Sequence, residues 1–85
     1  MRIAVVDDER PARSELKYLL EQCEPEAEIA EADGSEEFLA MLENETFDVC
    51  FVDINLGGMN GTTLASMIKR KQPDTLIIFA TAFQE

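Results

Sequence analysis

Three aspartates are the side chains of this sequence best suited to chemistry. Asp7 and Asp8 directly follow the apolar run Met1–Val6, and Asp53 lies near the end of a second run, Phe47–Ile54. Burying an isolated carboxylate costs several kcal/mol, so an acid inside the second run is hard to explain as a structural residue. Asp7 or Asp8 alone has a plainer explanation, because either could cap a helix that follows.

The carboxylates would converge if the strands that carry them are neighbours in one sheet. Two unit charges about 4 Å apart repel by about 4 kcal/mol at an effective dielectric constant of about 20, and a divalent cation offsets that repulsion. Carboxylates, a backbone carbonyl and water suit Mg²⁺. An aspartate held beside Mg²⁺ can act as a nucleophile and form an aspartyl phosphate. The hydroxyl of Thr81 could bond a phosphoryl oxygen, although it is equally an ordinary strand residue.

Short apolar runs alternate with helical patterns along the whole chain. We expect strands over residues 1–6, 28–33, 47–54 and 75–81, separated by helices that start near Pro11, at the turn 33–35 and after the glycine-rich turn 57–61. This order predicts a parallel sheet with helices on both faces. In such sheets, ligands bind beyond the carboxyl ends of the strands, where the three aspartates fall.

The composition describes one small, acidic, globular domain. The chain has 85 residues, with 7 Lys and Arg against 18 Asp and Glu, and a net charge of −11. This charge argues against binding of nucleic acid or of an anionic membrane by the chain itself. The apolar run before Asp7 is too short for a signal peptide or a membrane span, so we expect a cytoplasmic protein. Cys23 and Cys50 lie in apolar patterns and are expected to be reduced core thiols.

The chain resembles the receiver domain of bacterial two-component response regulators along its whole length. The matching segments are IAVVDDE at residues 3–9, VDINL at 52–56 with GMNG at 58–61, and ATA at 80–82. The DINLxGMNG stretch looks most like receivers of the LytR/AlgR type, which usually precede a LytTR DNA-binding domain. The resemblance implies a flavodoxin-like, doubly wound parallel α/β sheet with strand order 2-1-3-4. Residues 1–85 would form the N-terminal two-thirds of one receiver domain.

The resemblance also implies roles for the acids. Asp53 matches the phosphoacceptor, which takes a phosphoryl group from a sensor histidine kinase and switches an output, here transcription. Asp8 matches the direct ligand of Mg²⁺, and Asp7 acts on the metal through water. Asn55 matches the position whose backbone carbonyl completes the metal site. A receiver assists its own phosphorylation and is not a turnover enzyme.

Thr81 and Ala82 match two further positions of the family. Thr81 matches the switch hydroxyl that moves toward the phosphoryl group, and Ala82 matches the small residue that leaves this group access. Two departures stand out. Gly57 replaces the proline of many relatives, which makes the loop more flexible. The sequence also ends at Glu85, before the family's fifth strand and the lysine at its end.

The strand expected over residues 75–81 would then be an unpaired, apolar edge. We expect either a truncated form of a longer protein or a short form that a second copy completes, as a homodimer through this strand or by swapping. Two other functions stay open: a phosphorylation-independent interaction module, and a Mg²⁺-dependent phosphatase. The phosphatase would need a second acid two residues after its nucleophile, where this sequence has Asn55.

Overall fold

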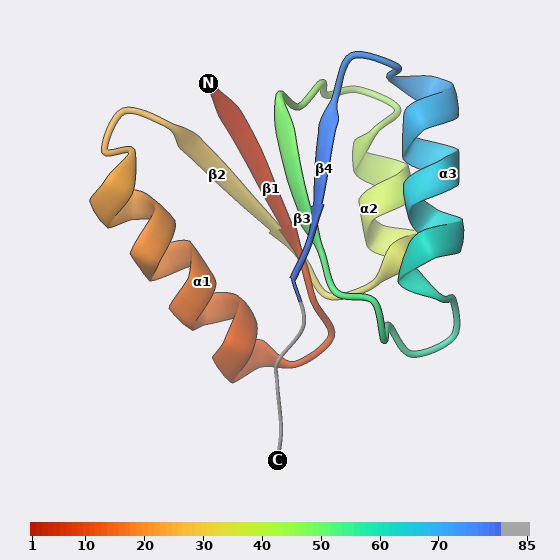
Figure 1. The fold of residues 1–85 in the computed structure, drawn as a ribbon, viewed down its shortest axis with the longest axis horizontal. Helices are drawn as coiled ribbons and strands as arrows, with labels where there is room; N and C mark the ends of the chain where they lie inside the picture. Colours follow the sequence, from red (N-terminus) through yellow and green to blue (C-terminus); the bar gives the residue numbers. More distant parts are fainter. Residues whose placement is uncertain (81–85) are drawn as a thin grey trace.

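Strands and helices alternate through the described part of the chain (Figure 1). The computed structural model describes residues 1–80, and residues 81–85 lie outside the described part. The elements in chain order are β1 (Arg2–Val6), α1 (Arg10–Cys23), β2 (Glu28–Ala32), α2 (Ser35–Met41), β3 (Val49–Val52), α3 (Gly61–Lys71) and β4 (Leu76–Phe79). Over the described residues, none of the helices has both the length and the apolar character needed to cross a membrane.

All four strands join one parallel sheet with the order β2-β1-β3-β4. Helix α1 covers one face of this sheet, whereas α2 and α3 cover the other (Figure 1). The doubly wound fold and the strand order expected from the sequence are thereby confirmed. The register pairs Val6 with Ala32 on one side and with Val52 on the other, and it pairs Val52 with Phe79. The carboxyl ends of the strands therefore lie at one level.

The main core fills the space between the sheet and the helices α2 and α3. Alternate residues of β1 and β3 point into it, because successive side chains of a strand face opposite sides of the sheet. Its most deeply buried members come from both strands and both helices: Ala4, Val6, Phe38, Cys50, Val52, Leu64 and Ile68. The ring centres of Phe38 and Phe47 lie 5.4 Å apart in a tilted pair. Cys50 is thus the core thiol that its apolar neighbours predict.

The opposite face of the sheet is only partly covered. Helix α1 carries no fully buried side chain, and Leu19 is 49% exposed. Among its other leucines, Leu16 and Leu20 are half-buried. Cys23, at the end of the same helix, is exposed, so the expectation of a core thiol there is wrong. The apolar spacing of α1 marks the face that turns to the sheet, but one helix covers that face incompletely.

Strand β4 is an edge of the sheet in the described part of the chain. Leu76 is 56% exposed and Phe79 is 43% exposed. Strand β4 is therefore not a buried strand, although its four residues are all apolar. The expectation of an exposed apolar edge holds over residues 1–80.

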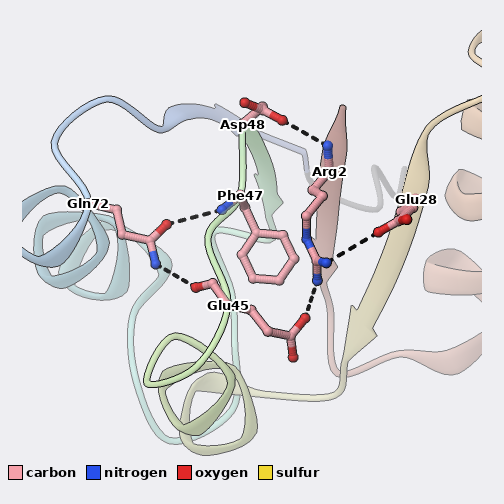
Figure 2. Close-up of polar contacts among 6 residues, drawn as sticks. All are labelled: Arg2, Glu28, Glu45, Phe47, Asp48 and Gln72. Atoms are coloured by element: carbon pink, nitrogen blue, oxygen red, sulfur yellow. Dashed lines mark hydrogen bonds and ion pairs between the residues drawn. The ribbon is translucent and has the colours of Figure 1, made fainter.

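A network around Arg2 closes the end of the sheet where the strands begin (Figure 2). The guanidinium pairs with Glu28 at 3.2 Å, pairs with Glu45, and lies 5.2 Å from the ring centre of Phe47. Gln72, which caps α3, accepts the N–H of Phe47 over 3.1 Å and donates to the carbonyl of Glu45 over 2.7 Å. These contacts join three segments that are distant in sequence. Asp7, Asp8 and Asp53 lie at the opposite end of the sheet, where β1 and β3 end.

Candidate functional site

Strands β1 and β3 place two of the three aspartates side by side. Val6 and Val52 pair in the register, and Asp7 and Asp53 are the residues that follow them. The N–H of Asp53 also donates to the carbonyl of Val6 over 3.0 Å, which extends the ladder by one step. One carboxylate oxygen from each of Asp7, Asp8 and Asp53 lies within 4.8 Å of the other two. The structure thus brings together the three acids that the sequence predicts to converge.

The two buried acids are held by short turns of their own backbone. Asp7 is 7% exposed and Asp53 is 5% exposed. Oδ1 of Asp7 accepts the N–H of Glu9 over 2.8 Å, and Oδ1 of Asp53 accepts the N–H of Asn55 over 3.1 Å. Each bond spans two residues, as in an Asx turn, and fixes the carboxylate against the chain. One oxygen of each group is engaged in this way, and the other accepts no hydrogen bond from the described residues.

Asp8 completes the cluster from its solvent side. This residue is exposed, and its Oδ2 accepts the N–H of Gly57 over 3.1 Å from the loop after β3. The N-cap of α1 is Glu9, which makes no side-chain cap bond, so helix capping explains neither Asp8 nor Asp7. The sequence did not predict the contact with Gly57. Its signal was the glycine itself, because a proline at this position would have no N–H to donate.

The cluster carries negative charge that no cation among the described residues compensates. Burial is the main cause that raises the pKa of Asp7. The N–H of Glu9 lowers that pKa, and the charges of Asp53, Asp8 and Glu9 raise it. Within residues 1–80, no lysine or arginine forms an ion pair with any of the three carboxylates. The acids therefore repel one another unless a cation is bound between them.

The donor set of this cluster fits Mg²⁺. The converging atoms are all carboxylate oxygens, the hard ligands that this ion prefers. The backbone at Asn55 lies beside the cluster, because its N–H donates to Oδ1 of Asp53. Asp8 and Asn55 also line a pocket of about 410 Å³. A dication bound by these residues would offset the repulsion that contributes to the raised pKa of Asp7.

Arg13 is a second contact of the site that the sequence did not predict. Its Nη1 donates to the backbone carbonyl of Asp7 over 2.8 Å, and its Nε donates to Oε1 of Glu31 on β2 over 3.0 Å. The side chain is only 14% exposed. A usable signal was present, because Arg13 lies three and seven residues before the half-buried Leu16 and Leu20. A charged residue on the inward stripe of a helix needs partners there.

Thr81 and Ala82 lie outside the described residues, so their predicted roles stay predictions. The described chain leads toward the cluster. The N–H of Ala80 donates to the carbonyl of Val52 over 2.9 Å, directly before Asp53.

Comparison with known proteins gives the family. Residues 3–85 match the response regulator receiver domain. The whole chain is 38% identical to the sensory transduction protein LytT of Bacillus subtilis, of which it covers 35%. Over 82 residues, or 96% of the chain, it is 46% identical to the sensory transduction protein LytR of Staphylococcus haemolyticus, of which it covers 32%. The chain therefore spans about a third of the length of these relatives.

Solved structures agree with this match. The response regulator TrrA of Thermotoga maritima, in complex with Mg²⁺ and beryllium fluoride, superposes with a TM-score of 0.86 at 36% identity; 98% of this chain and 70% of that one are covered. A receiver domain from Methanospirillum hungatei gives a TM-score of 0.87 at 32% identity, with 99% and 66% covered. The strand order, the acids at the carboxyl ends of β1 and β3, and these matches show that the chain belongs to the response regulator receiver domain family.

Proposed function

We propose that this chain is the phosphoacceptor part of a two-component response regulator. Asp53 receives a phosphoryl group from a sensor histidine kinase. Asp8, Asp53 and the backbone carbonyl of Asn55 would hold Mg²⁺ directly, and Asp7 would hold it through water. The observation that carries the proposal is the convergence of three carboxylates within 4.8 Å at the carboxyl ends of β1 and β3. The relative TrrA has been seen both with Mg²⁺ and beryllium fluoride and with the histidine kinase ThkA.

The transfer step uses the oxygen of Asp53 that the turn leaves open. Oδ1 accepts the N–H of Asn55, so Oδ2 attacks the phosphorus of the phosphohistidine. The new P–O bond forms as the P–N bond breaks, and the leaving nitrogen keeps the electron pair. Bound Mg²⁺ would offset the charge that builds up between the carboxylates and the phosphoryl group. Burial of Asp53 keeps most water away from the nucleophile until the donor arrives.

The first prediction tests this role with beryllium fluoride, a mimic of the phosphoryl group. We expect binding to the parent chain only when Mg²⁺ is present, and no binding to Asp53→Asn, which lacks the anionic nucleophile. Fluorine NMR of the bound complex is the measurement. Asp33→Asn is the matched control, because Asp33 also follows a strand, β2, but lies outside the cluster. Equal binding by Asp53→Asn would overturn the proposal.

The names of relatives support transcription as the output of this switch. Relatives from Staphylococcus aureus are named transcriptional regulatory protein LytR, and the chain covers 35% of their length. We therefore place a DNA-binding domain of LytTR type in the full protein and the whole protein in the cytoplasm. Thr81 senses the phosphoryl group and Ala82 leaves it room. Steady turnover is not part of this function, because Asn55 cannot protonate a leaving group.

A second candidate is a phosphorylation-independent dimerisation module. The exposed side chains of Leu76 and Phe79 on the edge strand β4 favour it, since an apolar edge can pair with a second copy. The net charge of −11 opposes it, because two copies repel. Light scattering distinguishes this candidate from the phosphoacceptor. If the Asp53→Asn variant is a dimer, and if adding Leu76→Glu to it disrupts that dimer, the result supports the dimerisation module.

A further inference from the structure

We propose that Arg13 is a positioning residue for the metal site. The inference rests on the proposed function, because it concerns the geometry in which Asp7 and Asp8 meet a divalent cation. Arg13 belongs to α1 and none of its atoms needs to touch the ion. It acts on the loop between β1 and α1 that carries both acids.

The bond from Arg13 to the loop fixes more than one atom. The carbonyl oxygen of Asp7, which accepts a hydrogen bond from Nη1 over 2.8 Å, belongs to the planar peptide unit that runs from Cα of Asp7 to Cα of Asp8. Holding this oxygen therefore sets the plane from which Asp8 departs. The carboxylate of Asp7 is separately fixed by the N–H of Glu9 over 2.8 Å. Without Arg13, the peptide plane between the two acids can rotate.

A strand anchors Arg13 from its other side. Nε donates to Oε1 of Glu31 on β2 over 3.0 Å, in a pair whose side chains are 14% and 33% exposed. Charge-assisted hydrogen bonds with little exposure are stronger than those between neutral groups. The guanidinium is thus held between β2 and the loop after β1. Because β2 pairs with β1, Arg13 fixes the position of the loop relative to the sheet.

The shape of arginine matters for this role. Nε and Nη1 donate in two different directions from one rigid plane, to Glu31 and to the carbonyl of Asp7. A lysine offers one ammonium on a flexible stem and cannot keep both bonds in the same geometry. Arg13 forms no ion pair with Asp7, Asp8 or Asp53 among the described residues. Its effect therefore runs through the backbone rather than through direct charge neutralisation.

Lys17 is a matched control on the same helix. Its Nζ lies 3.6 Å from Oε2 of Glu31, the same carboxylate that Arg13 uses, and 3.7 Å from Glu21. No hydrogen bond joins Lys17 to Asp7 in the described part of the chain. Loss of Lys17 removes a tie between α1 and β2, as loss of Arg13 does, but leaves the loop contact intact.

The experiment measures the dissociation constant of Mg²⁺ by calorimetry for the parent, Arg13→Met, Arg13→Lys and Lys17→Met. Removing groups that orient metal ligands typically weakens metal binding about 10- to 100-fold. We expect Arg13→Met to weaken Mg²⁺ binding about tenfold, Arg13→Lys to weaken it less, and Lys17→Met to leave it within about twofold of the parent. Without metal, the amide signals of Asp8 and Gly57 should shift in Arg13→Met and not in Lys17→Met.

The outcomes separate this inference from the function on which it rests. If the parent binds no Mg²⁺, the proposed function fails, and the role of Arg13 fails with it. If the parent binds Mg²⁺ but Arg13→Met binds equally well, or Lys17→Met loses as much affinity, Arg13 is only a structural tie. Should Arg13→Met fail to fold in a urea titration, Arg13→Lys carries the same comparison, and unchanged affinity there overturns the inference.

Discussion

Asp7 is a buried acid whose ionisation depends on its neighbours. Burial, together with the charges of Asp53 and Asp8, raises its pKa above the ordinary value of 3.8. The folded chain therefore binds a proton more readily at Asp7 than the unfolded chain does. The charge on Asp7 lowers the free energy of unfolding above the folded pKa. This cost shrinks as the pH falls through the folded pKa, and it is gone below the unfolded value.

The second prediction follows from that sign. Without metal at neutral pH, Asp7→Asn should raise the free energy of unfolding, and the gain should shrink as the pH is lowered toward 3.8. With saturating Mg²⁺ the order should reverse, because the parent gains binding energy that the variant lacks. Urea titrations with EDTA and with Mg²⁺ are the measurement. A lower stability of Asp7→Asn in EDTA at neutral pH would contradict the repulsion argument.

Gly61 is required by a close approach of two backbones. A Cβ there would collide with the carbonyl oxygen of Asp53 and lie 2.7 Å from Cα of Ile54. The N–H of Gly61 also donates to the carbonyl of Ile54 over 2.8 Å, which holds the start of α3 against the end of β3. Backbone atoms cannot rotate away as a side chain would.

The third prediction concerns this contact. We expect Gly61→Ala to lower the free energy of unfolding by about 1–3 kcal/mol or more. It should also weaken Mg²⁺ binding, since Asp53 must shift. The control is Gly34→Ala, where a Cβ meets nothing within 4 Å; its cost should stay below about 1 kcal/mol. Equal unfolding midpoints for the two variants would contradict the argument.

At the scale of elements, the two ends of the sheet carry different groups of polar side chains. The Arg2 network in Figure 2 joins β1, the α2–β3 loop and the α3–β4 turn where the strands begin. The aspartates meet where the strands end. The Arg2 network therefore lies at the opposite end of the sheet from the three acids, and a change in that network should leave the geometry of the acids intact.

The fourth prediction tests that separation. Gln72→Ala removes both bonds of its amide to the α2–β3 loop and leaves the N–H of Phe47 without its acceptor. An unsatisfied buried donor costs about 1–3 kcal/mol, so the free energy of unfolding should fall by that amount. The Mg²⁺ dissociation constant should not change. Gln22→Ala, at an exposed position of α1, is the control for a glutamine that supports no loop.

The sequence predicted the elements whose signals are local and periodic. The alternation of apolar runs and helical patterns was sufficient for the parallel sheet. The runs overshoot the strands, however. Phe47 leaves the ladder before β3 (Val49–Val52) to pair with Phe38. The sequence likewise grouped the three aspartates, because strand ends share one edge. It missed Arg13 and Gly57, whose contacts depend on how a loop and a helix settle against the sheet.

At the scale of the whole molecule, the sheet is covered unevenly. The face under α2 and α3 contains the main core. The face under α1 is only partly covered, and α1 itself has no fully buried side chain. Each side has one cysteine. Burial raises the pKa of the Cys50 thiol to about 12, whereas Cys23 is exposed on α1.

The fifth prediction uses these thiols as reporters. A thiol-specific reagent at mildly alkaline pH should modify Cys23 rapidly and Cys50 only as the core opens, because the thiolate is the reactive form. Mass spectrometry of the labelled peptides gives both rates. Mg²⁺ should slow the modification of Cys50 and leave that of Cys23 unchanged. Rapid labelling of both cysteines would contradict the burial of Cys50.

The pairing of Val6 with Val52 has a consequence for how this sequence can vary. A slip of one residue between these strands turns every side chain to the opposite side of the sheet. Asp53 would then point away from Asp7, with no change in composition. A single-residue deletion within β1 or β3 should thus abolish metal binding, whereas lengthening the turn between α1 and β2 should be tolerated. The register of the hydrogen bonds between β1 and β3 therefore determines whether the carboxylates of Asp7 and Asp53 meet.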